Sequence, residues 1–110
     1  MVVTIKDLED FENYLYSSEI DKYIKQIKQE EKMRFINKRN DLSVYISKAR
    51  TAQIKVVAIK LEQSSKELQD GINNIKKQIA SLEKEATILS TFSDLLGVFE
   101  KVFSSVLPLP

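Results

Sequence analysis

The sequence predicts an all-α fold, either an elongated helical hairpin or a three-helix bundle, with a long, coiled-coil-like central helix. Every seventh residue from Ile54 to Phe103 is apolar, and such a heptad column is typical of a helix that buries one narrow stripe. The only prolines, at positions 108 and 110, leave the rest of the chain free of the strongest helix breaker. A chain of 110 residues also favours a single domain, 1–110.

The first predicted element is an N-terminal helical arm over residues 5–36. Thr4 is placed to cap it, with Asp7 three residues later in the position of a capping-box acid. Apolar residues then recur at spacings of three and four. The phase slips at Ser17-Ser18, where Ser18 is a candidate second N-cap, so we expect a kink or short break there.

A loop is predicted over residues 37–41, where five polar residues interrupt the apolar pattern. The following segment, 42–61, is rich in β-branched residues, and its first six residues also fit a strand. A lone hairpin needs a partner sheet, and the remaining sequence offers no other strand. Helix is therefore the favoured prediction for 42–61, with strand as the alternative.

The central element is predicted as one long helix over residues 42–90, about 73 Å long at 1.5 Å per residue. Gly71 is the main challenge, because Asp70-Gly71 could end a helix. The apolar phase passes Gly71 without a slip, which favours continuity, and a glycine inside a helix costs only about 1 kcal/mol. A break would instead give three helices of about thirty residues.

An apolar C-terminal helix is predicted over residues 92–107. The pattern Thr91-x-x-Asp94 is a second capping signal, and Phe92, Phe99 and Phe103 fall on one face. This face could pack in the core of the bundle. It could also enter a membrane interface or a partner's groove.

The composition excludes several kinds of active site. The chain has no cysteine and no histidine, which excludes Ser-His-Asp and Cys-His catalysis, His-ligated zinc and Glu-x-x-His di-iron sites. Neither a glycine-rich phosphate loop nor a calcium-loop pattern is present. We therefore predict a non-enzymatic protein with no catalytic, cofactor or metal site.

The charge distribution raises the question of nucleic acid as a partner. The net charge is only +1, but residues 19–60 carry eleven Lys or Arg against five acids. The basic segment 22–60 could contact phosphates. Pairs at i,i+4 such as Glu30 and Arg34, and the missing RNA-binding motifs, favour a solvated surface instead.

The function that this pattern favours is protein–protein interaction or assembly, with self-association through the heptad stripe. The partner would be a second copy or another helical protein, because the 42–90 helix is longer than the 5–36 arm can cover. The alternative packing is that the arm covers the stripe within one chain. The expected interface residues are Ile54, Leu61, Leu68, Ile72, Ile75, Ile79, Leu82, Leu89, Leu96, Phe99 and Phe103.

Two other functions remain open. The first is a membrane-active helical subunit, for example a component of a multi-part pore-forming assembly, acting through 92–107. The second is a nucleic-acid-binding helical protein acting through 22–60. The N-terminal residues lack the apolar core of a signal peptide, and the sequence has no uninterrupted apolar window long enough to span a membrane. We therefore expect a cytoplasmic location.

Overall fold

The structure is a computed structural model, and it describes residues 3–51 and 54–103. These residues form six helices and no strand, which confirms the all-α class and the helical prediction for the described part of 42–61. The helices are α1 (Ile5–Leu15), α2 (Ser18–Gln26), α3 (Gln29–Thr51), α4 (Ile54–Gln63), α5 (Ser65–Ala80) and α6 (Glu85–Phe103).

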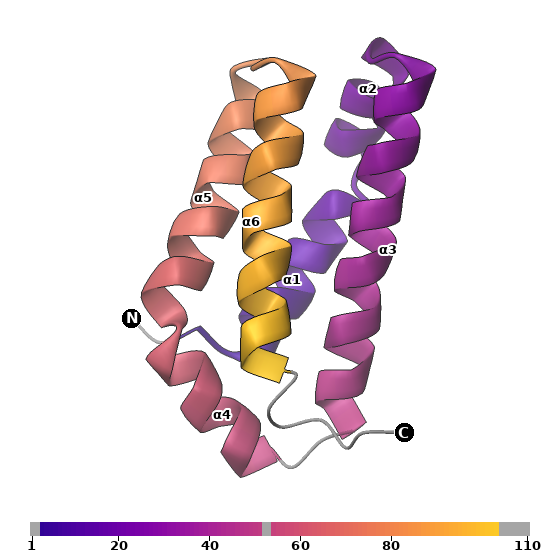
Figure 1. The fold of residues 1–110 in the computed structure, drawn as a ribbon. Coiled ribbons are helices and arrows are strands. Elements are labelled where there is room, and N and C mark those ends of the chain that lie inside the picture. The colour runs from indigo at the N-terminus through magenta and orange to yellow at the C-terminus, as the bar shows by residue number, and fades with distance from the viewer. Residues whose placement is uncertain (1–2, 52–53, 104–110) are drawn as a thin grey trace.

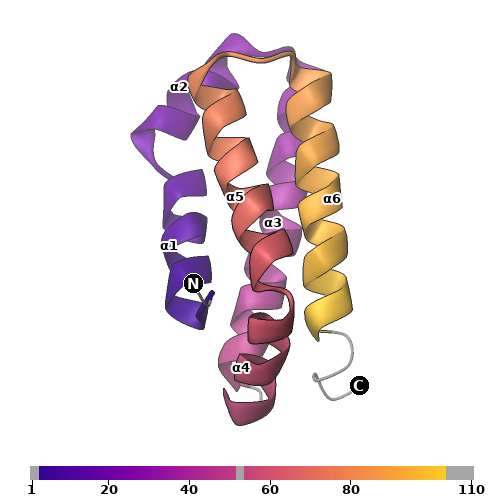
Figure 2. The same ribbon diagram turned by 90° about the vertical axis from the view of Figure 1, so that its left-hand side faces the viewer.

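The helices pack side by side in an up-down-up-down arrangement (Figure 1). Helices α1 and α2 lead up, α3 returns, α4 and α5 lead up again, and α6 returns, so that α3 and α6 run parallel. Helix α6 packs against α3, α4 and α5, while α1 packs against α3. Seen from the side, α1 lies next to α5 (Figure 2), where the Lys76 ammonium lies 5.3 Å from the centre of the Tyr14 ring.

Helix α1 begins where the sequence predicts. The Thr4 amide donates to Asp7 Oδ2 at 2.9 Å, and the Asp7 amide donates to Thr4 Oγ1 at 3.2 Å, so the capping box is confirmed. The helix ends at Leu15, and the N-cap of α2 is Ser17 rather than Ser18. The break is held by Arg39 of α3, whose Nη1 donates to the Leu15 carbonyl at 3.0 Å.

The prediction of one arm over 5–36, followed by a loop at 37–41, is wrong. The chain reverses earlier, at Ile27-Lys28, and α3 then runs through the polar segment without interruption. Phe35 and Leu42, on either side of that segment, are fully buried. Each Asn or Asp in a helix costs only a fraction of a kcal/mol, so the packing of these two side chains outweighs the local turn preference.

The predicted continuous helix over 42–90 is also wrong, and its first described break is a kink at Ser64. The Ser65 hydroxyl donates to the Leu61 carbonyl at 2.7 Å and accepts a hydrogen bond from the Val3 amide at 2.9 Å. A serine that bonds back to the carbonyl four residues earlier tends to bend a helix. Beyond this kink α5 continues through Gly71, as predicted.

A full reversal of the chain follows α5, at residues 81–84. The Glu83 amide donates to the Gln78 carbonyl at 2.9 Å and the Leu82 amide to the Ile79 carbonyl at 3.1 Å, which is the Schellman pattern of a helix C-terminus. Leu82 has a φ of 55°, a left-handed conformation that is usually occupied by glycine. The heptad column therefore runs over α4, α5 and the antiparallel α6, and does not belong to one rod.

The predicted start of a separate C-terminal helix at residue 92 is corrected as well. Helix α6 begins at Glu85, and Thr91 lies inside it with its hydroxyl donating to the Thr87 carbonyl at 3.0 Å. Residues 104–107 lie outside the described residues. The longest extent of the chain is 40 Å, so the predicted elongated form gives way to a compact globule.

Candidate interaction surface

Most of the predicted interface residues lie inside the chain's own core. The stripe faces inward because α5 and α6 pack on each other and α6 packs on α3. One chain covers its own stripe in this structure, but the covering helices are α3 and α6 rather than the predicted 5–36 arm. The members that are less than one-tenth exposed are Leu61, Leu68, Ile72, Ile75, Ile79, Leu89, Phe99 and Phe103.

Three predicted interface residues have other positions. Leu82 is 68% exposed at the α5–α6 turn. Leu96 is half-buried on α6, at the edge of a surface groove. Helix α4 includes Ile54, but the environment of this side chain lies outside the described part of the structure.

A surface groove runs between the parallel helices α3 and α6. Its volume is about 530 Å³, and its apolar lining comes from Val44 and Tyr45 of α3 and from Leu96 of α6. Val44 is 51% exposed. At Gly97, a Cβ atom would have no neighbour within 4 Å, so the α6 backbone is open to close approach from outside.

One ring lines the groove, that of Tyr45, and it packs on two buried rings of α6. The Tyr45 ring stacks on Phe99 and Phe103 with centroids 6.4 and 6.3 Å apart, and these two phenylalanines stack on each other. Burial raises the pKa of the Tyr45 hydroxyl, and the nearby carboxylates of Glu100 and Asp41 raise it further. Tyr45 is therefore a neutral, fixed part of this surface at physiological pH.

The rim of the groove carries both signs of charge. Lys38 and Lys48 of α3 line it together with Asp41 of α3 and Glu100 of α6. The Lys38 ammonium donates to the Ser93 hydroxyl at 2.7 Å, which links the two helices across the groove. A groove with an apolar floor and a mixed rim has the anatomy of a protein interface.

The basic segment 22–60 does not form an open basic surface throughout, because its arginines have acceptors within the chain. Arg50 bonds to Glu9 at 2.9 Å and lies 3.5 Å from Glu12. Arg34 bonds to Glu30 at 3.0 Å. Arg39 bonds to the Leu15 carbonyl and covers the Tyr16 ring at 4.2 Å.

The apolar face of 92–107 faces the core over its described part. Phe92, Phe99 and Phe103 are fully buried, where Phe92 meets the Phe35 ring edge to face at 5.5 Å. No helix in the described parts of the chain is long and apolar enough to cross a membrane. Within the same residues, no cluster of three or more metal-ligating side chains is found.

Comparison with known proteins gave no match to a family model, to a curated protein or to a solved structure. The functional argument therefore depends on the geometry of the chain itself. Sequence reasoning missed the groove residues Val44, Tyr45 and Gly97, because the groove exists only once α3 and α6 lie parallel. One feature of the sequence could have indicated the groove. Val44 is apolar but does not fall on the helix face that carries the buried Leu42 and Ile46.

Proposed function

We propose that this chain is a non-enzymatic protein–protein interaction subunit, and that its interaction surface is the groove between α3 and α6. The single observation that carries the proposal is this groove of about 530 Å³, with exposed Val44, half-buried Leu96 and a Tyr45 ring that packs on the buried Phe99. Exposed apolar surface with a polar rim is typical of interaction sites.

The occupant that the groove fits best is a second copy of the chain. In a two-fold dimer the same patch meets itself, so it must be self-complementary. The rim is consistent with this condition because side chains of both signs lie along it, among them Asp41 and Glu100. Gly97 adds to the fit, since a helix backbone can approach closely where no side chain intervenes.

The self-association proposed here differs from that expected from the heptad column. The column residues already lie in the core of one chain, so a dimer through them requires the chain to open. A dimer through the groove leaves the core intact. The coiled-coil expectation is accordingly replaced by contact between two folded subunits.

The experiment is a measurement of molar mass by light scattering across a wide range of protein concentrations. The wild type should rise from 12.7 kDa towards twice that value. Val44→Asp and Gly97→Leu should each keep the monomer mass, because one places a charge in the apolar groove and the other fills the space above α6. Circular dichroism should show native helicity in both variants.

The matched control is Ile59→Asp on α4, because Ile59 is 55% exposed and does not line the groove. This variant should associate like the wild type. A wild type that stays monomeric at every concentration would refute self-association. Dissociation caused by Ile59→Asp, with Val44→Asp unaffected, would place the interface on another face.

The other two functions have weaker support. A membrane-active role through 92–107 requires α6 to leave its neighbours, because its phenylalanines are buried. A nucleic-acid role through 22–60 requires a basic surface, and three of its arginines are engaged within the chain. Neither has an accessible, preformed surface comparable to the groove, so we favour protein–protein interaction.

A further inference from the structure

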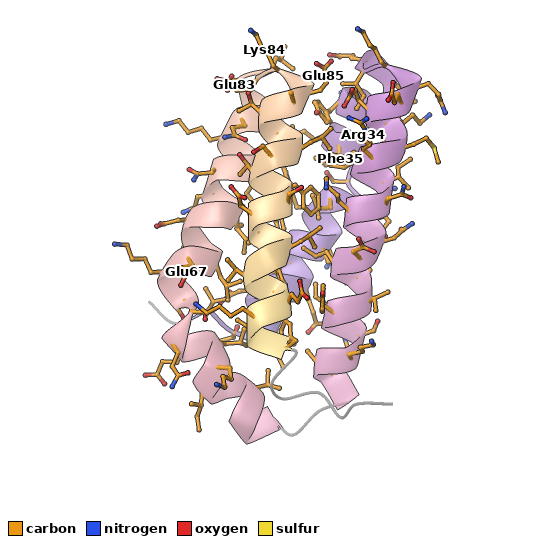
Figure 3. All side chains as sticks on the ribbon, viewed as in Figure 1. Arg34, Phe35, Glu67, Glu83, Lys84 and Glu85 are labelled. Atoms are coloured by element: carbon orange, nitrogen blue, oxygen red, sulfur yellow. The ribbon has the colours of Figure 1, made fainter. Side chains whose placement is uncertain are left out.

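A second, smaller hollow lies at the opposite end of the bundle from α4. Its volume is about 160 Å³, and it is lined by Tyr23, Gln26 and Ile27 from the end of α2 and by Leu82, Glu83 and Glu85 from the α5–α6 turn. Figure 3 shows Glu83, Lys84 and Glu85 at this end, near Arg34, while Glu67 lies towards the other end. No lining residue is shared with the α3–α6 groove.

Tyr23 contributes an unpaired polar atom to this hollow. Its side chain is only 5% exposed, and its hydroxyl has no hydrogen-bond partner among the described residues. The ring cannot easily turn away, because it packs edge to face on Phe35 with centroids 5.6 Å apart. A buried hydroxyl without a hydrogen-bond partner destabilises the fold, so a ligand that supplies a partner would relieve this cost.

The charged residues that line the hollow are both acidic. Glu83 and Glu85 line it, and neither is in a salt bridge within the described parts of the chain. Burial raises the pKa of Tyr23 to about 12, and Glu85 and Glu31 add to the rise. The phenol is therefore neutral at pH 7 and can accept a hydrogen bond beside these carboxylates.

Leu82 gives the hollow an apolar wall at some energetic cost. It has a φ of 55° and is 68% exposed, and a left-handed conformation is unfavourable for a residue other than glycine. Glycine would satisfy the turn without this cost. Strained residues are concentrated at functional sites, and the Leu82 side chain together with Ile27 offers hydrocarbon surface to a ligand stem.

From these observations we infer that the hollow binds a primary alkylammonium group, with the ammonium on Tyr23 Oη and the Glu85 and Glu83 carboxylates and the stem against Leu82 and Ile27. An ammonium has three donors and no acceptor, which matches a site made of acceptors. A volume of about 160 Å³ suits a four-carbon amine. The group can come from a lysine side chain of a protein or from a free polyamine.

The test is a titration of the full chain with n-butylammonium chloride, followed by amide chemical shifts at constant ionic strength. Saturable shifts confined to residues 23–27 and 82–85 are expected, with a dissociation constant of about 1 mM for so small a ligand. The neutral isostere n-butanol should give no saturable shift. Shifts spread evenly over surface carboxylates, or equal shifts with butanol, would overturn the inference.

Two variants and a matched control complete the test. Tyr23→Phe and Glu85→Gln should each weaken binding by about fivefold or more, since each removes one hydrogen bond to the ammonium. Tyr45→Phe changes a tyrosine that lines only the other groove, and it should bind like the wild type. Unchanged affinity in both site variants would refute the assignment. Both variants should keep the wild-type self-association, which separates this site from the proposed function.

The source of the amine is distinguished by two further probes, Nα-acetyl-lysine methylamide and 1,4-diaminobutane. Tighter binding of the blocked lysine would identify a protein side chain as the ligand. Tighter binding of the diamine would identify a polyamine. Failure of both probes to bind, together with failure of butylammonium, would end the proposal.

Discussion

Leu82 combines two features that folded proteins usually avoid, a left-handed backbone on a branched residue and a large apolar side chain in solvent. Tyr23 and Ser65 are unusual in a different way. The Tyr23 hydroxyl is buried without a partner, while the Ser65 hydroxyl is buried with two. The Ser65 hydroxyl has a structural role, because it links the N-terminal segment to the α4–α5 kink. The Tyr23 hydroxyl has no such partner among the described residues.

Replacing Leu82 with glycine should stabilise the fold by about 1 kcal/mol, because glycine adopts positive φ without strain. Little burial is lost, since the side chain is mostly exposed. Urea denaturation measures the change as a higher midpoint. The matched control is Ala80→Gly, in the last turn of α5, which should lower stability by about 1 kcal/mol. If both glycines destabilise equally, the positive φ at Leu82 carries no strain.

The tyrosines should make stability depend on alkaline pH. Burial raises the pKa of Tyr14 and of Tyr23 from 10.0 to about 12, with smaller contributions from Glu19 and Glu85. A pKa that is higher in the folded state gives stability that is fully present below pH 10 and is lost as the pH rises through about 12. Absorbance at 295 nm should show these two rings ionising late, together with loss of helical circular dichroism. Ionisation of every tyrosine near pH 10 in a folded chain would contradict this.

The reversals of the chain, rather than the helices, define this fold. The reversal at Ile27-Lys28 and the one at residues 81–84 contain no glycine or proline, and each turns the chain without a strong local signal. The polar segment 37–41 has a strong turn signal and is helical. Tertiary packing therefore decides where the helices of this chain end.

The signals that succeeded in the sequence are local ones. The Thr4 capping box and the continuity of α5 through Gly71 follow from spacing within one helix. The heptad column led to the wrong prediction of one long helix. The seven-residue period continues across the turn at Leu82, so the buried faces of the antiparallel helices α5 and α6 resemble one stripe in the sequence. The groove could not be predicted, because it depends on which helices become neighbours. The spacing of apolar residues shows which face of a helix is buried, but not which other helix covers that face.

The two glycines provide a matched test of helix packing. Gly97→Ala should stabilise the monomer by about 1 kcal/mol, because a helix favours alanine and the added Cβ meets nothing within 4 Å. At Gly71 the added Cβ would lie 2.8 Å from Leu95 Cδ1, and Leu95 is 2% exposed. Gly71→Ala should therefore stabilise the fold less than Gly97→Ala does, or destabilise it, as measured by thermal unfolding. Equal gains at both sites would show that Leu95 moves freely.

The molecule has one continuous core with α6 at its centre. A chain of edge-to-face rings, Tyr23, Phe35 and Phe92, joins α2, α3 and α6. The stacked rings of Tyr45, Phe99 and Phe103 join α3 and α6 further along. Because both ring groups use α3 and α6, aromatic packing holds these two parallel helices together at two places along their length.

Phe92→Ala should cost about 3–5 kcal/mol, as expected for a buried ring replaced by a cavity. Small domains have a total stability of about 5–15 kcal/mol, so this variant should be close to unfolded at room temperature. Chemical denaturation followed by circular dichroism measures the loss. The control Val44→Ala, at a 51% exposed position, should change stability by less than about 0.5 kcal/mol. Comparable losses in both variants would show that Phe92 is not central.

The position of α6 has a consequence for how the chain is made. Protein synthesis delivers residues in order, and the helix at the centre of the core, Glu85–Phe103, leaves the ribosome after α3 and α5. Until α6 emerges, the apolar faces of α3 and α5 lack the helix against which they pack. The core of a nascent chain of this protein can therefore close only after α6 has been synthesised.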